Sequence, residues 1–135
     1  MTRTAEIFIR SVNGEAEMEL LTSGRVLYED DCIWIEYEED PKITGMDHTL
    51  TKIGISPDVI TVNRIGDFVS TMVFEQGKDF EYLFNTPFGN TQATLHASKV
   101  EVASDERGVK LQLEYSLDFG GAQIENLITV DCTLQ

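Results

Sequence analysis

The sequence has few basic residues, and this scarcity limits the partners that the protein can have. Ten Lys and Arg residues oppose 24 Asp and Glu residues in a chain of 135, which gives a formal net charge of −14. Such a charge repels the phosphates of nucleic acids and anionic lipid surfaces. We therefore expect no nucleic-acid partner and no membrane partner, whereas a cation, a basic protein surface or a neutral ligand stays open.

Long apolar runs are also missing. No stretch reaches the 18 apolar residues typical of a membrane-spanning helix, and Met1–Glu6 lead into no apolar segment of signal-peptide length. We therefore expect a cytoplasmic protein. Cys32 and Cys132 lie far apart in strand-like contexts, where reduced thiols usually serve as small core residues.

Motifs for catalysis and metal binding are absent. The chain has no Gly-x-Ser-x-Gly, no glycine-rich phosphate loop, and no Cys-x-x-Cys or His-x-His spacing. His48 and His96 are isolated, and the run 29–31 lacks the spaced oxygen ligands of an EF-hand. We assign no catalytic residue, no metal ligand and no cofactor, and the pattern favours a noncatalytic protein without excluding an enzyme.

Apolar and polar residues alternate with a period of two through most of the chain, which predicts strands. Gly, Asn, Asp or Pro bounds these segments repeatedly, and Asn13-Gly14 is a strong hairpin signal. The predicted strands span residues 4–12, 15–28, 32–38, 44–55, 59–64, 68–75, 80–84, 91–103, 109–118 and 122–134. A bend is expected near Gly24 in the second strand.

The order of the segments predicts their topology. Strands that follow one another through short connections, without a crossover helix, favour an antiparallel, up-and-down arrangement. Closing such a sheet removes its exposed edges. We predict a single all-β domain over residues 1–135, a closed β-barrel of about eight to ten strands, with a β-sandwich as the alternative.

Short motifs occur in the same order along nearly the whole chain as in one known family. They are Tyr37-Glu38-Glu39, Arg64-x-Gly66, Met72-x-Phe74 with Gly77, Thr86-Pro87-x-Gly89, and Gly108 with Leu113-x-Tyr115. Together they resemble the YwiB-like family of small bacterial β-barrel proteins. The resemblance implies a lipocalin-like, calycin-type barrel in a bacterial cytoplasm, and it implies no activity and no catalytic residue.

Arg64 is a charged residue within an apolar, strand-like run. If Val62 points inward, alternation also turns Arg64 inward, where it needs a carboxylate or a ligand anion, and Glu36 and Glu38 are candidates. The favoured interpretation places Arg64 at the barrel rim, with its five donors capping carbonyls of the turn 65–67. A ligand contact is the alternative.

The predicted strand 32–38 has two distinct faces. Glu36 and Glu38 share one face with Trp34, whereas Ile35 and Tyr37 share the other. We favour the arrangement in which Ile35 faces the core and both glutamates face water. In the alternative arrangement the two carboxylates enter the barrel, where neighbouring charges could set up the acid and the base of a hydrolase.

In the neighbouring predicted strands 68–75 and 80–84, large side chains stand at alternate positions, so both strands can point them into the same interior. They either fill the core or surround a small apolar ligand with a few polar contacts. The predicted ligand-binding residues are Arg64, Met72, Phe74, Tyr82 and Tyr115.

Three functions follow from these features. The leading one is a noncatalytic barrel that binds a small hydrophobic or amphipathic molecule in its interior. The second is a packed barrel that forms a homodimer or binds a basic protein through its acidic surface. The third is a hydrolase that uses inward glutamates.

Overall fold

The computed structural model describes residues 1–135 and consists almost entirely of β-strands. The strands are β1 (Thr2–Asn13), β2 (Ala16–Glu29), β3 (Cys32–Glu38), β4 (Thr49–Ile55), β5 (Ile60–Gly66), β6 (Val69–Phe74), β7 (Asp79–Thr86), β8 (Gly89–Asp105), β9 (Gly108–Asp118) and β10 (Gln123–Leu134). The helix α1 (Pro41–Thr44) joins β3 to β4. No helix is long and apolar enough to cross a membrane.

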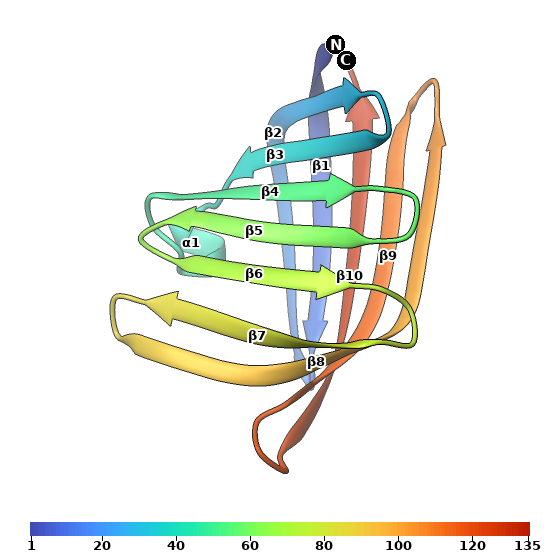
Figure 1. Cartoon of the computed structure of the whole chain (residues 1–135). Coiled ribbons are helices and arrows are strands. Elements are labelled where there is room, and N and C mark those ends of the chain that lie inside the picture. The colour runs from blue at the N-terminus through green and yellow to red at the C-terminus, as the bar shows by residue number, and fades with distance from the viewer.

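Each strand pairs with its neighbours in the sequence, and β1 pairs with β10 to close the barrel. In Figure 1, β3 to β7 run across the view while β1, β9 and β10 stand upright, so that the interior lies between two crossing layers. The predicted closed, antiparallel, up-and-down barrel is confirmed, and the β-sandwich alternative is wrong, because hydrogen bonding continues around the whole circuit.

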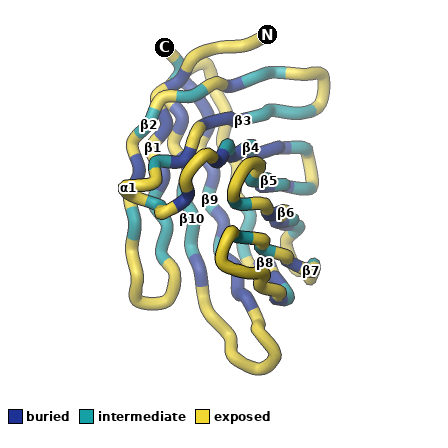
Figure 2. Tube along the Cα trace, turned by 90° about the vertical axis from the view of Figure 1, so that its left-hand side faces the viewer, coloured by how far each residue is buried: buried dark blue, intermediate teal, exposed yellow.

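Alternating side chains build the core. Ile7 on β1, Ile35 on β3, and Val109, Leu111 and Leu113 on β9 are all 2% exposed or less. Burying an aliphatic side chain of this size stabilises the fold by roughly 1.5–3 kcal/mol relative to leaving it exposed. Figure 2 shows buried positions along the strands and exposed residues at the hairpin tips. One continuous apolar core therefore fills the barrel.

The segment between β3 and β4 differs from the prediction, which began a strand at Thr44. Asp40 caps a helical turn by accepting a hydrogen bond from Lys42 N at 2.9 Å, and Pro41 lies in the first turn. Gly45, with φ of 74°, ends the helix in the left-handed region. The fourth strand therefore begins only at Thr49.

The hairpin predicted at Asn13-Gly14 is confirmed with a shift of one residue. Asn13 still pairs with Ala16 across the strands, so the two-residue turn consists of Gly14 and Glu15. Gly14 has a φ of 61°, which glycine adopts without strain. The first two strands consequently form a tight antiparallel ribbon, visible in Figure 1.

Both cysteines are free thiols. Cys132 is 2% exposed and belongs to the core, as predicted. Cys32, at the start of β3, is only partly buried.

Candidate functional site

Arg64 points into the barrel. It follows Ile60 and Val62 on the inward face of β5, which are 1% and 4% exposed, and its own side chain is 16% exposed. The rim clamp predicted for Arg64 is wrong, because no hydrogen bond joins its side chain to the turn 65–67. That turn is held from the other side, where Asp67 N donates to His48 O at 3.3 Å.

One row of inward side chains crosses the barrel wall at the level of Arg64. Cross-strand pairing places Tyr37 opposite Thr51, Thr51 opposite Arg64, Arg64 opposite Ser70, and Ser70 opposite Phe84. Directly opposed side chains on one face lie close enough to interact. The row therefore brings two hydroxyls and a phenol to the two sides of one buried arginine.

Glu39 supplies the carboxylate that faces Arg64. Its Oε2 lies 3.8 Å from Arg64 Nε, and its side chain is 2% exposed. Thr51 Oγ1 donates to the same Oε2 at 2.5 Å. A separation of 3.8 Å allows charge attraction but exceeds the range of a hydrogen bond. Arg64 and Glu39 therefore attract each other as charges, but the donor Arg64 Nε and the acceptor Glu39 Oε2 form no hydrogen bond with each other.

The predicted partners of Arg64, Glu36 and Glu38, lie on the outer face of β3. Glu36 accepts a hydrogen bond from Arg25 at 2.7 Å and lies 3.3 Å from Lys52 Nζ, while Glu38 is exposed. The favoured orientation of the strand is confirmed for Ile35 and Glu38, whereas Glu36 is on the outer face but buried at 8% exposure against Arg25 and Lys52 and does not face water as predicted. The hydrolase alternative, which required Glu36 and Glu38 inside the barrel, is wrong.

Two polar atoms in this row have no hydrogen-bond partner. They are Arg64 Nε and Ser70 Oγ, both fully buried. Buried polar atoms in native proteins are almost always paired, and leaving one unpaired costs about 1–3 kcal/mol. Two such atoms on directly opposed residues mark a position at which a bound polar group or water would satisfy the barrel wall.

Three tyrosines approach the same region from different strands: Tyr37 on β3, Tyr82 on β7 and Tyr115 on β9. Burial raises the pKa of all three hydroxyls, to about 12 for Tyr115, and the positive charge of Arg64 lowers each pKa in part. Arg64 therefore favours the ionised form of all three hydroxyls, but burial outweighs it. At neutral pH the hydroxyls are uncharged and can donate or accept hydrogen bonds.

The predicted interior residues Met72, Phe74, Tyr82 and Tyr115 do face the interior, and all are at most 7% exposed. The Phe74 and Tyr115 rings meet edge to face with centroids 4.9 Å apart, a favourable aromatic geometry. These four side chains pack the core. Of the predicted binding residues, only Arg64 lines the small cavity in the barrel interior.

That cavity has a volume of about 50 Å³ and lies between Arg64 and Glu39 on one side and aliphatic side chains on the other. Met18 and Met46 both line it. A space of this size holds a few waters, whereas pockets for drug-sized ligands occupy roughly 300–1,000 Å³. The interior is therefore largely filled, and its free space adjoins the charged pair.

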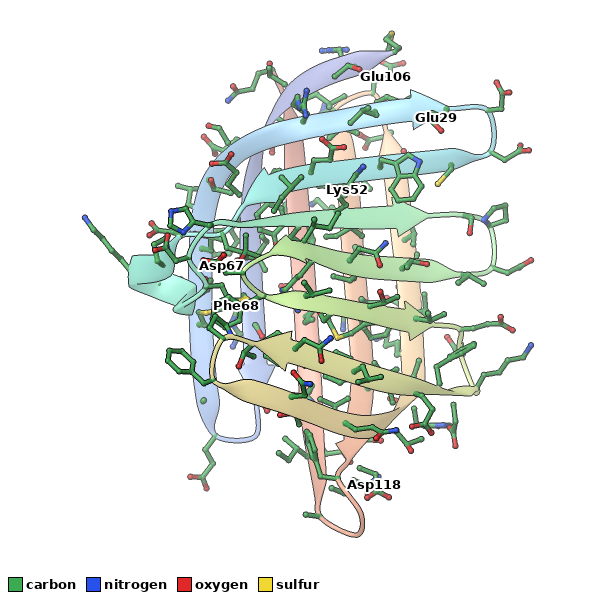
Figure 3. The ribbon with its side chains drawn as sticks, turned by 60° about the vertical axis from the view of Figure 1, so that its left-hand side comes forward. Glu29, Lys52, Asp67, Phe68, Glu106 and Asp118 are labelled. Carbon is green, nitrogen blue, oxygen red and sulfur yellow. The ribbon has the colours of Figure 1, made fainter.

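Aromatic side chains connect this region to the barrel mouth. Phe68 lies in the turn between β5 and β6, and its ring is 6.0 Å from that of Phe84, which stacks with Tyr82 at 6.1 Å. Figure 3 shows Asp67 and Phe68 beside α1 at this end of the barrel. The series runs from an exposed turn to the buried tyrosines near Arg64.

Sequence reasoning missed Glu39, Thr51 and Ser70. Glu39 has the parity of Ile35 and Tyr37, so the alternation that correctly oriented β3 would have placed it inside had the strand been continued by one residue. Alternation gives Ser70 the parity of the inward Met72 and Phe74, but only cross-strand register brings Thr51 and Ser70 to Arg64.

These features define a small, closed, ten-stranded antiparallel β-barrel protein with an arginine–glutamate pair in its interior. Residues 5–128 match the family model described as a domain of unknown function, DUF1934, and the chain belongs to this family. Membership carries no activity with it.

The structure is similar to the crystal structure of the YwiB protein from Bacillus subtilis, with a TM-score of 0.86 over 99% of this chain and 93% of that chain. The two sequences are 16% identical, so the similarity establishes the shared fold. The predicted YwiB-like barrel is confirmed. Among curated proteins, none matched the sequence.

Proposed function

We propose that the barrel binds a small amphipathic molecule at the mouth end of its interior, without catalysing a reaction. The polar group of the ligand bonds to Arg64, and its apolar part occupies the aliphatic cavity. The observation that carries this proposal is the buried Arg64 Nε, which has no hydrogen-bond partner and lies at the wall of that cavity.

The chemistry of the cavity supports an amphipathic ligand. Most of its wall is apolar, and its polar side is formed by Ser11, Tyr37, Glu39 and Arg64. Ligand sites commonly combine an apolar wall with a few polar groups that fix orientation. The cavity beside Arg64 likewise has an apolar wall and a few polar groups, in a smaller volume.

The volume of about 50 Å³ requires the cavity to enlarge when a ligand enters. Met46 lies in the link between α1 and β4 and is 8% exposed, and Met18 approaches from β2. Methionine side chains are flexible and repack readily. Moving Met46 outward would add its own volume to the cavity and would open a path from the mouth.

The test is to purify the protein without refolding, release bound small molecules with organic solvent and identify them by mass spectrometry. The wild type should carry a molecule that is missing from Arg64→Met. Arg10→Met is the matched control, because Arg10 lies on the outer surface and pairs with Glu17 at 2.6 Å. Equal recovery from wild type and Arg64→Met would reject the interior site.

A second candidate is protein binding at the barrel mouth, with a basic partner or a second copy of the chain. Phe88 is 93% exposed at the β7–β8 turn, and Ile65 and Val69 are 53% and 45% exposed at the neighbouring β5–β6 turn. Exposed apolar clusters mark interaction sites, and the adjacent Asp67 would favour a basic partner.

Sedimentation velocity and capture from lysate test this second candidate. Under it, Phe88→Ser abolishes dimerisation or capture, and molar salt weakens capture of a basic partner because salt screens exposed charges. A monomer at all concentrations together with salt-insensitive capture would reject it.

A further inference from the structure

The charges of the interior site are already balanced. Arg64 carries one positive charge and Glu39 one negative charge, and they lie 3.8 Å apart. The tyrosine hydroxyls around them are neutral, since burial keeps them protonated. A ligand that brought a net charge would place a third, uncompensated charge in a poorly solvated interior, which is strongly unfavourable.

Part of the hydrogen-bonding capacity of the pair is unused. Arg64 Nε is a buried donor without an acceptor. Glu39 uses Oε2 to accept from Thr51, and an ionised carboxylate can accept further bonds at both oxygens. A neutral group placed here can therefore accept from Arg64 and donate to Glu39 at the same time.

We propose that the ligand presents an uncharged group with an adjacent donor and acceptor, of the primary carboxamide type, to Arg64 and Glu39, and that it is neither a carboxylate nor an amine. This inference rests on the function proposed above and adds the class of ligand. The carbonyl oxygen of the amide accepts from Arg64, and its NH2 group donates to Glu39.

The experiment is a titration of the ¹⁵N-labelled protein, followed by NMR, with four molecules of equal chain length: pentanamide, pentanoate, pentylamine and 1-pentanol. At neutral pH the second is an anion and the third a cation. We expect pentanamide to bind tightest and to shift amides of β3 and β5, with both charged molecules weaker by about tenfold or more. 1-Pentanol should fall between, because its hydroxyl can accept from Arg64 and donate to Glu39 at once but must reach both side chains from a single oxygen atom.

Two results would overturn the proposal in different ways. Tighter binding of pentanoate or pentylamine than of pentanamide rejects the neutral class while it upholds the binding site. If none of the four shifts any amide near Arg64, the proposed function fails together with this inference.

Two variants that each remove one charge of the pair test the charge argument itself. Glu39→Gln leaves Arg64 uncompensated and should change the preference to pentanoate, whereas Arg64→Gln leaves Glu39 uncompensated and should change it to pentylamine. The matched controls Glu17→Gln and Arg10→Gln, which alter the exposed pair, should keep pentanamide first. An unchanged order in both interior variants would show that the charge of the pair does not select the ligand.

Discussion

Arg64 and Glu39 face each other across 3.8 Å inside the barrel, close enough for charge attraction and too far apart for a hydrogen bond. β4 lies between β5, which carries Arg64, and β3, which ends one residue before Glu39, and its Thr51 is both the cross-strand partner of Arg64 and the hydrogen-bond donor to Glu39. The pair therefore depends on the register of three strands. Its strength and its surroundings give the predictions that follow.

Glu39→Gln should destabilise the protein by about 3 kcal/mol. The substitution keeps the shape of the side chain but leaves the Arg64 charge without a counter-ion in the interior, and breaking a buried ion pair in this way is costly. Urea denaturation measures the change in the free energy of unfolding. The partial exposure of Arg64, 16%, places the effect at the lower end of the usual range.

The double variant Glu39→Gln, Arg64→Met provides the check on that prediction. It removes both charges, so its cost should be clearly smaller than the sum of the two single substitutions. Glu17→Gln, which breaks the exposed pair with Arg10, should change stability by less than about 1 kcal/mol. Simple additivity of the interior substitutions would show that the two residues do not interact.

Gly66→Ala should destabilise the barrel mouth by roughly 2 kcal/mol or more. Gly66 has a φ of 130°, and a Cβ there would lie 2.0 Å from His48 O, a backbone atom that cannot move aside cheaply. Gly45→Ala is the control, because Gly45 also has a positive φ, 74°, but faces open space. Gly45→Ala should cost only about 1 kcal/mol. Thermal and urea unfolding measure both variants, and an equal loss of stability in Gly66→Ala and Gly45→Ala would contradict the steric argument.

Stability should fall as the pH rises from about 10 to 12. Burial raises the pKa of Tyr115 from 10.0 to about 12, so the folded state favours the protonated hydroxyl. A raised pKa gives a contribution that is complete below the pKa of the unfolded chain and is lost as the pH approaches that of the folded chain. For Tyr115 the loss is about 3 kcal/mol, and Tyr37 and Tyr82 shift in the same direction.

The measurement is the urea midpoint at a series of alkaline pH values, with tyrosinate absorbance recorded in parallel. Tyr115→Phe should lose less stability over the same range, since it lacks the ionising hydroxyl. A midpoint that stays constant through pH 12 would mean that the hydroxyl is not buried as described.

Only one thiol should react with Ellman's reagent in the native protein. Burial, assisted by the charge of Asp131, raises the pKa of Cys132 to about 12, and its side chain is inaccessible in the core. Because the thiolate is the reactive form, Cys132 should react only after unfolding, while the partly exposed Cys32 reacts first. Cys32→Ser should then show no fast thiol; rapid reaction of that variant would contradict the burial of Cys132.

The sequence predicted which side chains are buried better than it predicted what they contact. Alternation correctly turned Ile35 and Tyr37 inward, and the same logic placed Met72 and Phe74 in the interior. The helix α1 was missed because four residues are too few for a helical period, although Asp40 and Gly45 are its local capping signals. A periodic pattern therefore cannot reveal a helix that is only about one turn long.

The orientation of Arg64 followed from parity, whereas its partner did not. The favoured rim clamp put the guanidinium on the turn 65–67, and the proposed carboxylates were Glu36 and Glu38, which lie on the opposite face of β3. The first error came from ending the fifth strand at Arg64, although β5 continues to Gly66, and the second from not following the alternation one residue beyond β3 to Glu39. Because side chains alternate, one residue decides between the inside and the outside of a barrel.

The sequence by itself determined the antiparallel order of the strands, their closure into a barrel and the inward face of most of them, because short connections and period-two alternation are local properties of the chain. The tertiary structure alone decided that Glu39, Thr51 and Ser70 meet Arg64, and that about 50 Å³ remains beside them. The physical reason is that register and packing depend on contacts between strands distant in the chain, and no local pattern encodes the distance between two side chains on different strands.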